Sequence, residues 1–101
     1  MRIIIFFDLP TETIKQQRDY RKFRKLLINQ GFIMMQESVY SKLALNMSAI
    51  ISIKEKIEKN KPDDGLIQSL VITEKQFASI DTIIGKNVSE KINNTDRMVI
   101  I

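Results

Sequence analysis

The most constraining feature of this chain is a continuous apolar run close to its first residue. Residues 2–8 read Arg-Ile-Ile-Ile-Phe-Phe-Asp, so apolar side chains occupy successive positions rather than alternate ones. Such a run is typical of a strand that is covered on both faces. Pro10 must end the strand, because it cannot donate a ladder hydrogen bond and restricts Leu9 before it. The 101 residues of the chain suffice for one domain around this strand and are too few for two.

The segment after this strand predicts an amphipathic helix. Thr11 or Thr13 can cap a helix that runs to about Asn29, and Gly31 follows where a C-terminal cap is expected. At 100° per residue, four apolar side chains share one face: Tyr20, Phe23, Leu26 and Leu27. Four cations share the opposite face: Arg18, Arg21, Lys22 and Lys25.

A second helix and several strands are predicted further along the chain. The helix begins around Asn46 and ends before Pro62, where a turn-forming cluster follows. We assign its apolar side to Met47, Ile50, Ile51 and Ile57. Four segments after the first helix are interpreted as strands: residues 32–41, 66–73, 77–84 and 97–101.

We interpret this series as an α+β fold with the βαββαβ order of the split βαβ, or ferredoxin-like, arrangement, plus one extra C-terminal strand. We expect residues 1–85 to form the ferredoxin-like core and residues 86–101 to form a loop and the last strand. The two helices of this fold cover one face of the sheet, yet Ile4 and Phe6 place apolar side chains on the other face. Because a small protein rarely leaves such a patch in water, we expect a homodimer joined through this face.

Composition excludes several classes of chemistry. The chain has no cysteine, which excludes disulfides and thiolate metal sites, and it has no histidine, the usual general base near neutral pH. Hydrolysis would therefore need carboxylates and a hard cation, or a partner. No apolar run approaches the roughly 18 residues of a membrane span, and the first run is too short for a signal peptide. We expect a cytoplasmic protein without membrane contact.

The positive charge of the chain is concentrated in the first helix. Residues 11–30 hold six basic and two acidic residues, and this excess of four equals the net charge of +4. Clustered cations suit phosphate contacts, and no motif for reading bases is visible, so sequence-independent nucleic-acid binding is predicted. The predicted contacts are Lys15, Arg18, Arg21, Lys22 and Lys25. A merely solvated helix surface is the alternative interpretation.

Asp8 is the candidate catalytic and metal-binding residue. It ends an apolar strand directly before a turn, and carboxylate oxygens are ligands that Mg²⁺ or Mn²⁺ prefers. If the first strand lies near a dimer axis, two copies of Asp8 could share one cation that relieves their repulsion. An acceptor for the amides of the following turn is the simpler alternative.

Four short motifs follow one another in the order of these elements. They are Phe6-Phe7-Asp8-Leu9-Pro10, Arg21-Lys22-Phe23-Arg24-Lys25-Leu26-Leu27, Gly31-Phe32 with Gln36-Glu37-Ser38-Val39-Tyr40, and Thr73-Glu74-Lys75-Gln76-Phe77. Together they resemble the CRISPR-associated protein 2 family, in the branch that accompanies type II systems. The likeness extends over nearly the whole chain. Ser41 departs from it, because many members have glutamate there, and so do residues 9–13, where many carry further acidic or arginine residues.

The resemblance implies a homodimer that bridges two dimers of the CRISPR-associated integrase and holds a short double-stranded DNA during spacer acquisition. It also implies a metal-dependent endonuclease of RNA or DNA with Asp8 as the matching metal residue. The terminal strand would pack on the neighbouring subunit or the integrase. The contacts expected with the partner are Ile4, Phe6, Met98, Val99 and Ile100.

Three functional hypotheses follow. The first is a DNA-binding bridge with little or no catalysis of its own, which the two departures favour. The second is a Mg²⁺-dependent phosphodiesterase that uses Asp8 from both subunits, with single-stranded RNA or duplex DNA as substrate. The third is a toxin-like ribonuclease or small regulatory domain, because fold alone does not fix function. Whether the chain is an enzyme is left open at this point.

Overall fold

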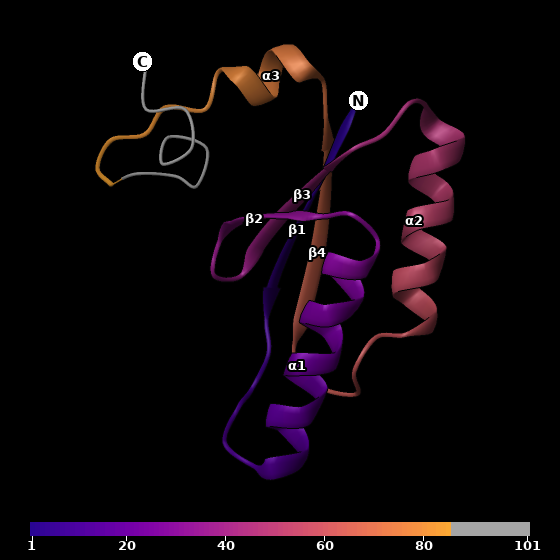
Figure 1. Cartoon of the computed structure of the whole chain (residues 1–101), viewed down its shortest axis with the longest axis vertical. Helices are drawn as coiled ribbons and strands as arrows, with labels where there is room; N and C mark the ends of the chain where they lie inside the picture. Colours follow the sequence, from indigo (N-terminus) through magenta and orange to yellow (C-terminus); the bar gives the residue numbers. More distant parts are fainter. Residues whose placement is uncertain (86–101) are drawn as a thin grey trace.

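The computed structural model describes residues 1–85, which form one antiparallel sheet, two long helices and a short one (Figure 1). The elements are β1 (Arg2–Asp8), α1 (Ile14–Asn29), β2 (Ile33–Gln36), β3 (Val39–Leu43), α2 (Met47–Lys59), β4 (Leu66–Ile72) and α3 (Glu74–Ala78). The strands lie in the order β2-β3-β1-β4, so the apolar first strand is an interior strand as its sequence predicts. The predicted α+β, ferredoxin-like class is confirmed.

The predicted strand over residues 32–41 is a hairpin of two strands. A turn at Glu37 and Ser38 separates β2 from β3, and the register between the strands shifts between Met34 and Gln36. This turn contains no glycine, proline or asparagine, so the sequence gives no strong turn signal. The hairpin supplies the two adjacent strands that the βαββαβ order requires.

The predicted strand over residues 77–84 is wrong. The short helix α3 ends at Ala78, and residues 79–85 belong to no strand. Thr73 accepts a hydrogen bond from the backbone of Gln76, and the Gln76 side chain accepts one from the backbone of Thr73. This reciprocal capping box favours a helical turn over an extended one. The predicted terminal strand, and the whole segment of residues 86–101, lie outside the described residues.

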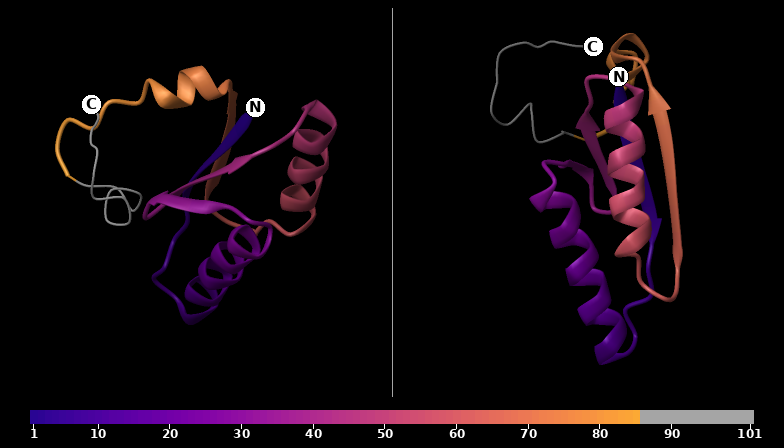
Figure 2. Two further views of the ribbon diagram at one scale, coloured as in Figure 1. Left: turned by 45° about the horizontal axis from the view of Figure 1, so that its top comes forward. Right: turned by 90° about the vertical axis from the view of Figure 1, so that its right-hand side faces the viewer.

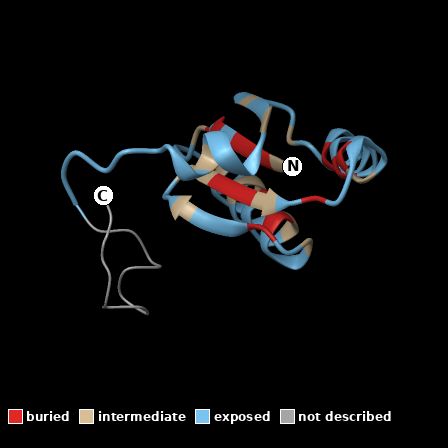
Figure 3. Cartoon of the chain, turned by 90° about the horizontal axis from the view of Figure 1, so that it is seen from above, coloured by how far each residue is buried: buried red, intermediate tan, exposed pale blue. Residues whose placement is uncertain are grey.

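Both long helices pack against the same face of the sheet, as the right-hand view of Figure 2 shows. Ile3, Ile5 and Phe7 of β1 point into this layer and are at most 5% exposed. The Phe7 ring lies 5.1 Å from that of Phe23 on α1 and 5.7 Å from that of Tyr40 on β3. The core therefore lies between the sheet and the two long helices, and the buried segments coloured red in Figure 3 belong to these elements and the loops that join them.

Each long helix begins at the predicted cap. Thr13 caps α1 in a capping box with Gln16, and Asn46 caps α2. The predicted apolar side of α2 is partly wrong, because Met47 is 48% exposed and Ile51 is 52% exposed. The side chains that α2 buries are Ile50, Ile53 and Ile57. Within residues 1–85, no helix is long and apolar enough to span a membrane.

Candidate functional site

The packing of α1 exposes the predicted basic face. Phe23 and Leu27 are buried against the sheet, and Tyr20 and Leu26 pack beside them. The opposite face of the helix therefore points into solvent. All four cations predicted on that face are exposed: Arg18, Arg21, Lys22 and Lys25. The structure thus places these four predicted contacts on one surface, which we call the basic face of α1.

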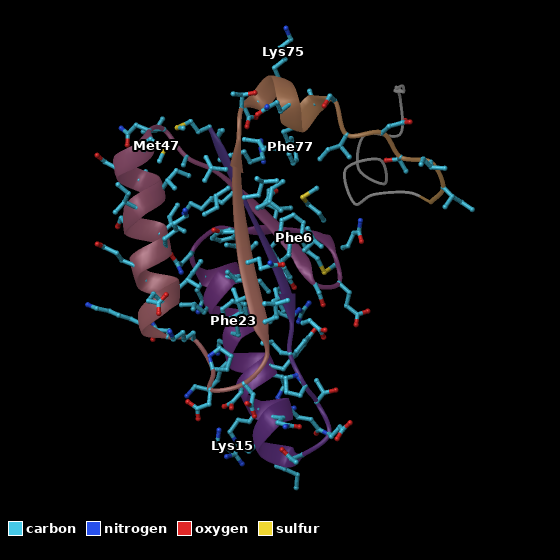
Figure 4. All side chains as sticks on the ribbon, turned by 180° about the vertical axis from the view of Figure 1, so that it is seen from behind. Phe6, Lys15, Phe23, Met47, Lys75 and Phe77 are labelled. Atoms are coloured by element: carbon cyan, nitrogen blue, oxygen red, sulfur yellow. The ribbon has the colours of Figure 1, made fainter. Side chains whose placement is uncertain are left out.

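Lys15 differs from these four cations because it is already paired. Its Nζ atom lies 3.0 Å from an Asp19 carboxylate oxygen and 3.4 Å from one of Asp63 in the loop before β4. The hydrogen bond to Asp19, helped by that to Asp63, raises the pKa of Lys15. Lys15 lies at the end of the molecule opposite α3 (Figure 4). Within residues 1–85, Lys15 is the one cation of α1 that forms an ion pair. The cations from Arg18 onward therefore have no carboxylate partner there.

Arg24 is the sixth cation of α1, and the sequence-based prediction left it out. It precedes Lys25 and lies one turn after Arg21, toward the sheet side of the helix. Its Nε atom donates a hydrogen bond of 2.8 Å to the hydroxyl of Tyr40 on β3. The sequence carries no signal for this bond, because the two residues are 16 positions apart and meet only when α1 packs on the hairpin.

Asp8 lies at the end of β1, beside Leu66 of β4, and is exposed. By strand alternation it shares the helix-free face of the sheet with Phe6. Gly65, just before β4, allows the backbone there to lie close to the end of β1, because a Cβ atom on Gly65 would lie 2.8 Å from the Asp8 carbonyl oxygen. Among residues 1–85 there is no group of three or more carboxylates that could hold a metal ion.

Apolar side chains cover much of the sheet face that no long helix covers. Figure 4 views the molecule from the side of this sheet face. Phe6 of β1 lies on it and is 37% exposed. The other exposed apolar residues of this face are Ile33, Leu43, Leu66 and Leu70, whose exposed fractions run from 49% to 62%. Ile4, an expected partner contact, also points to this side but is only 4% exposed in the single chain. Met98, Val99 and Ile100 lie outside the described residues. We call this surface the open sheet face.

Helix α3 contacts β1 at one end of the open sheet face. Arg2 on β1 makes two hydrogen bonds of 2.9 Å to the carboxylate of Glu74. The Arg2 guanidinium also lies 4.1 Å from the centre of the Phe77 ring, in a cation–π contact. The bond from Arg2 holds the pKa of Glu74 below its ordinary value. Residues 74–77, at the junction of two segments predicted as strands, therefore fold back onto the first strand.

Comparison with known proteins gives a consistent result. The family model described as CRISPR associated protein Cas2 matches residues 1–80. A protein of Treponema denticola named CRISPR-associated endoribonuclease Cas2 is 50% identical over the full length of both chains. A protein of the same name from Ligilactobacillus salivarius is 44% identical, again over the full length of both. The crystal structure of Streptococcus pyogenes Cas2 at pH 6.5 covers 82% of this chain and 99% of its own, with a TM-score of 0.64 at 18% identity.

Proposed function

Because this chain belongs to the CRISPR-associated protein Cas2 family, we propose that it acts in spacer acquisition as a homodimer that binds the backbone of double-stranded DNA and bridges dimers of the CRISPR-associated integrase. The observation that carries this proposal is the basic face of α1. Its four cations are exposed and have no carboxylate partner within residues 1–85. Such a surface attracts a polyanion through charge alone, without reading its sequence.

The open sheet face supports the dimer. Five large apolar side chains there are at least 37% exposed in the single chain. Burying such a patch against a second copy removes apolar area from water, at about 25 cal/mol per Å². Because α1 lies on the other side of the sheet, a dimer joined in this way presents both basic faces outward (Figure 2). The partner predicted from the first strand and the DNA contacts predicted from α1 are therefore geometrically compatible.

Charge reversal on α1 tests the DNA interface. The variant Arg21→Glu/Lys22→Glu should bind a duplex of arbitrary sequence more weakly than the unmodified protein. The plot of log affinity against log salt should also become flatter, by about 0.9 for each phosphate that the variant no longer neutralises. The matched control is Lys54→Glu/Lys56→Glu on α2, which changes the net charge equally at two exposed positions. Equal binding by the two double variants would remove this role from α1.

Bridging needs its own experiment. We expect the protein to co-purify with the integrase and to be required for insertion of a short duplex into a plasmid that carries the repeat array. The same assay with Arg21→Glu/Lys22→Glu separates partner binding from DNA binding, because that variant should retain the integrase and lose insertion. Full insertion by the integrase alone would contradict the bridging role.

A metal-dependent endonuclease is the second candidate function, favoured by the position of Asp8 and by the name endoribonuclease that the relatives carry. Asp8 is exposed on the open sheet face, so a twofold dimer through this face contributes two such carboxylates. Mg²⁺ is often held by one or two carboxylates together with waters and substrate phosphates, so this donor set fits the ion. Bound there, Mg²⁺ or Mn²⁺ would supply a polarised phosphate and an activated water.

The test of this second candidate is Asp8→Asn, which keeps the size of the side chain and removes its charge. Cleavage of single-stranded RNA and of duplex DNA should fall to the level of a metal-free reaction. Glu37→Gln, at the exposed turn between β2 and β3, is the control. Cleavage that survives in Asp8→Asn would show that the activity comes from elsewhere.

A further inference from the structure

Within residues 1–85, Arg24 is the one cation of α1 that donates a side-chain hydrogen bond to a neutral side chain, the hydroxyl of Tyr40, whereas Lys15 bonds only to carboxylates. Tyr40 is fully buried, and its ring packs at 5.7 Å from that of Phe7 in the centre of the core. Its hydroxyl is therefore fixed by the sheet and not by the helix surface. The Arg24 side chain emerges beside this hydroxyl and is held by it through Nε at 2.8 Å.

We infer that Arg24 is a preorganised phosphate-binding residue and that Tyr40 is its positioning residue. This inference rests on the proposed DNA-binding function and adds a contact that the basic face of α1 does not include. The guanidinium is a planar group with five N–H donors. The bond to Tyr40 uses the donor on Nε, which leaves the pair of terminal nitrogens that forms a two-pronged contact with a phosphate.

The surroundings of Arg24 agree with this role. The residue is exposed, and within residues 1–85 no carboxylate forms an ion pair with it. Arg21 lies one turn before it, so the two cations are neighbours on the helix surface. Arg24 therefore extends the basic face of α1 toward the sheet, and a backbone that crosses α1 could meet both residues.

Preorganisation has a measurable consequence. A long side chain that is already fixed loses less conformational freedom when it binds, so the contact is stronger than that of a mobile cation. Tyr40→Phe keeps the buried ring and removes only the hydroxyl. We expect it to weaken binding of duplex DNA by about two- to tenfold while leaving the salt dependence unchanged, because no charge is removed.

The experiment measures the affinity of the full chain for a fluorescent duplex of arbitrary sequence at several salt concentrations. Arg24→Ala should weaken binding and also flatten the salt dependence, by about 0.9 for each phosphate that is no longer neutralised. In the Arg24→Ala background, Tyr40→Phe should have no further effect, because the residue it positions is gone. Tyr20→Phe is the matched control: its ring also contacts Phe7, and its hydroxyl makes no hydrogen bond within residues 1–85.

Two further measurements keep the inference falsifiable. Arg24→Lys keeps the charge at an exposed position, so it does not depend on how the core tolerates Tyr40→Phe. It should bind as weakly as Tyr40→Phe, because lysine has no Nε–H for the hydroxyl and no planar fork. Thermal unfolding of each variant shows that binding is compared between folded proteins.

The outcomes separate this inference from the function on which it rests. If Arg21→Glu/Lys22→Glu weakens binding but Arg24→Ala, Arg24→Lys and Tyr40→Phe do not, the inference fails and the DNA interface stands. If Tyr40→Phe weakens binding equally with and without Arg24, Tyr40 has a structural role only and the inference is overturned. If charge reversal on α1 has no effect, the interface itself is refuted.

Discussion

Gly65 shows how one residue sets the position of Asp8. Its backbone has φ = +106°, and an added Cβ would lie 2.6 Å from Cδ2 of Leu9 and 2.8 Å from the Asp8 carbonyl oxygen. Residues other than glycine rarely adopt this backbone conformation. The contact of an added Cβ with the carbonyl oxygen could be relieved only by moving the end of β1. The close approach of β4 to the end of β1 therefore depends on glycine.

We predict that Gly65→Ala lowers the free energy of unfolding by about 2 kcal/mol or more, from backbone strain and this contact together. Urea unfolding measures the effect. Gly85→Ala is the matched control, because Gly85 has the same φ of +106° and no atom within 4 Å of an added Cβ. If the two variants were destabilised equally, the contact with Asp8 and Leu9 would contribute nothing.

Glu74 predicts a pH dependence for the attachment of α3. The hydrogen bonds from Arg2 lower the pKa of Glu74, so the bond stabilises the fold at pH values above the unfolded value of 4.5. This contribution disappears as the pH falls through the lowered pKa. Glu74→Gln should therefore unfold at a lower temperature than the unmodified protein at pH 7 and at the same temperature near pH 2. A constant difference across this range would show that the ion pair does not stabilise the fold.

At the residue scale, the sequence predicts which cations are exposed but not what each one contacts. Exposure follows from helical periodicity, so the four cations of the basic face of α1 were placed correctly. Lys15 meets Asp63 and Arg24 meets Tyr40 only through the tertiary packing of distant segments. No local pattern encodes these two contacts, whereas the pairing of Lys15 with Asp19 follows the i, i+4 spacing of a helix.

Helix α2 provides a test at the scale of a whole element. Its core residue Ile53 is 8% exposed, whereas Ile51, which the sequence pattern favoured, is 52% exposed. We predict that Ile53→Ala lowers the free energy of unfolding by about 2–4 kcal/mol, and that Ile51→Ala changes it by less than about 1 kcal/mol. Chemical denaturation of the two variants distinguishes the two possible faces. The reverse order would restore the face predicted from the sequence.

The elements that the sequence predicted best are those with strong local signals. The helices α1 and α2 begin at their predicted caps, and β1 was recognised by its apolar run. Two elements were missed, for different reasons. Residues 77–84 alternate like a strand, but the capping box of Thr73 and Gln76 is a local helix signal that the interpretation of the sequence overlooked. The contacts of Arg2 with Glu74 and Phe77, which no local pattern encodes, then hold α3 beside β1. The turn at Glu37 and Ser38 forms because both strands pair in the sheet.

At the scale of the molecule, the open sheet face predicts the oligomeric state. Leu70 is 49% exposed on this face, and Ile51 is 52% exposed on α2, so the two offer similar apolar area. Leu70→Glu should shift the protein from dimer to monomer in sedimentation at micromolar concentration, because it would bury two charges at the interface. Ile51→Glu should remain a dimer. A dimer that tolerates Leu70→Glu would place the interface on another surface.

The interior position of β1 also determines when the fold can form during synthesis. Strand β1 is synthesised first and pairs with β3 on one side and β4 on the other. The later of these two neighbours, β4, ends at Ile72. A growing chain on the ribosome therefore carries an apolar strand whose edge stays unpaired until residue 72 has emerged. Until then that strand is open to wrong partners, including other nascent chains. The sheet can therefore be completed only after the ribosome has released the chain as far as residue 72.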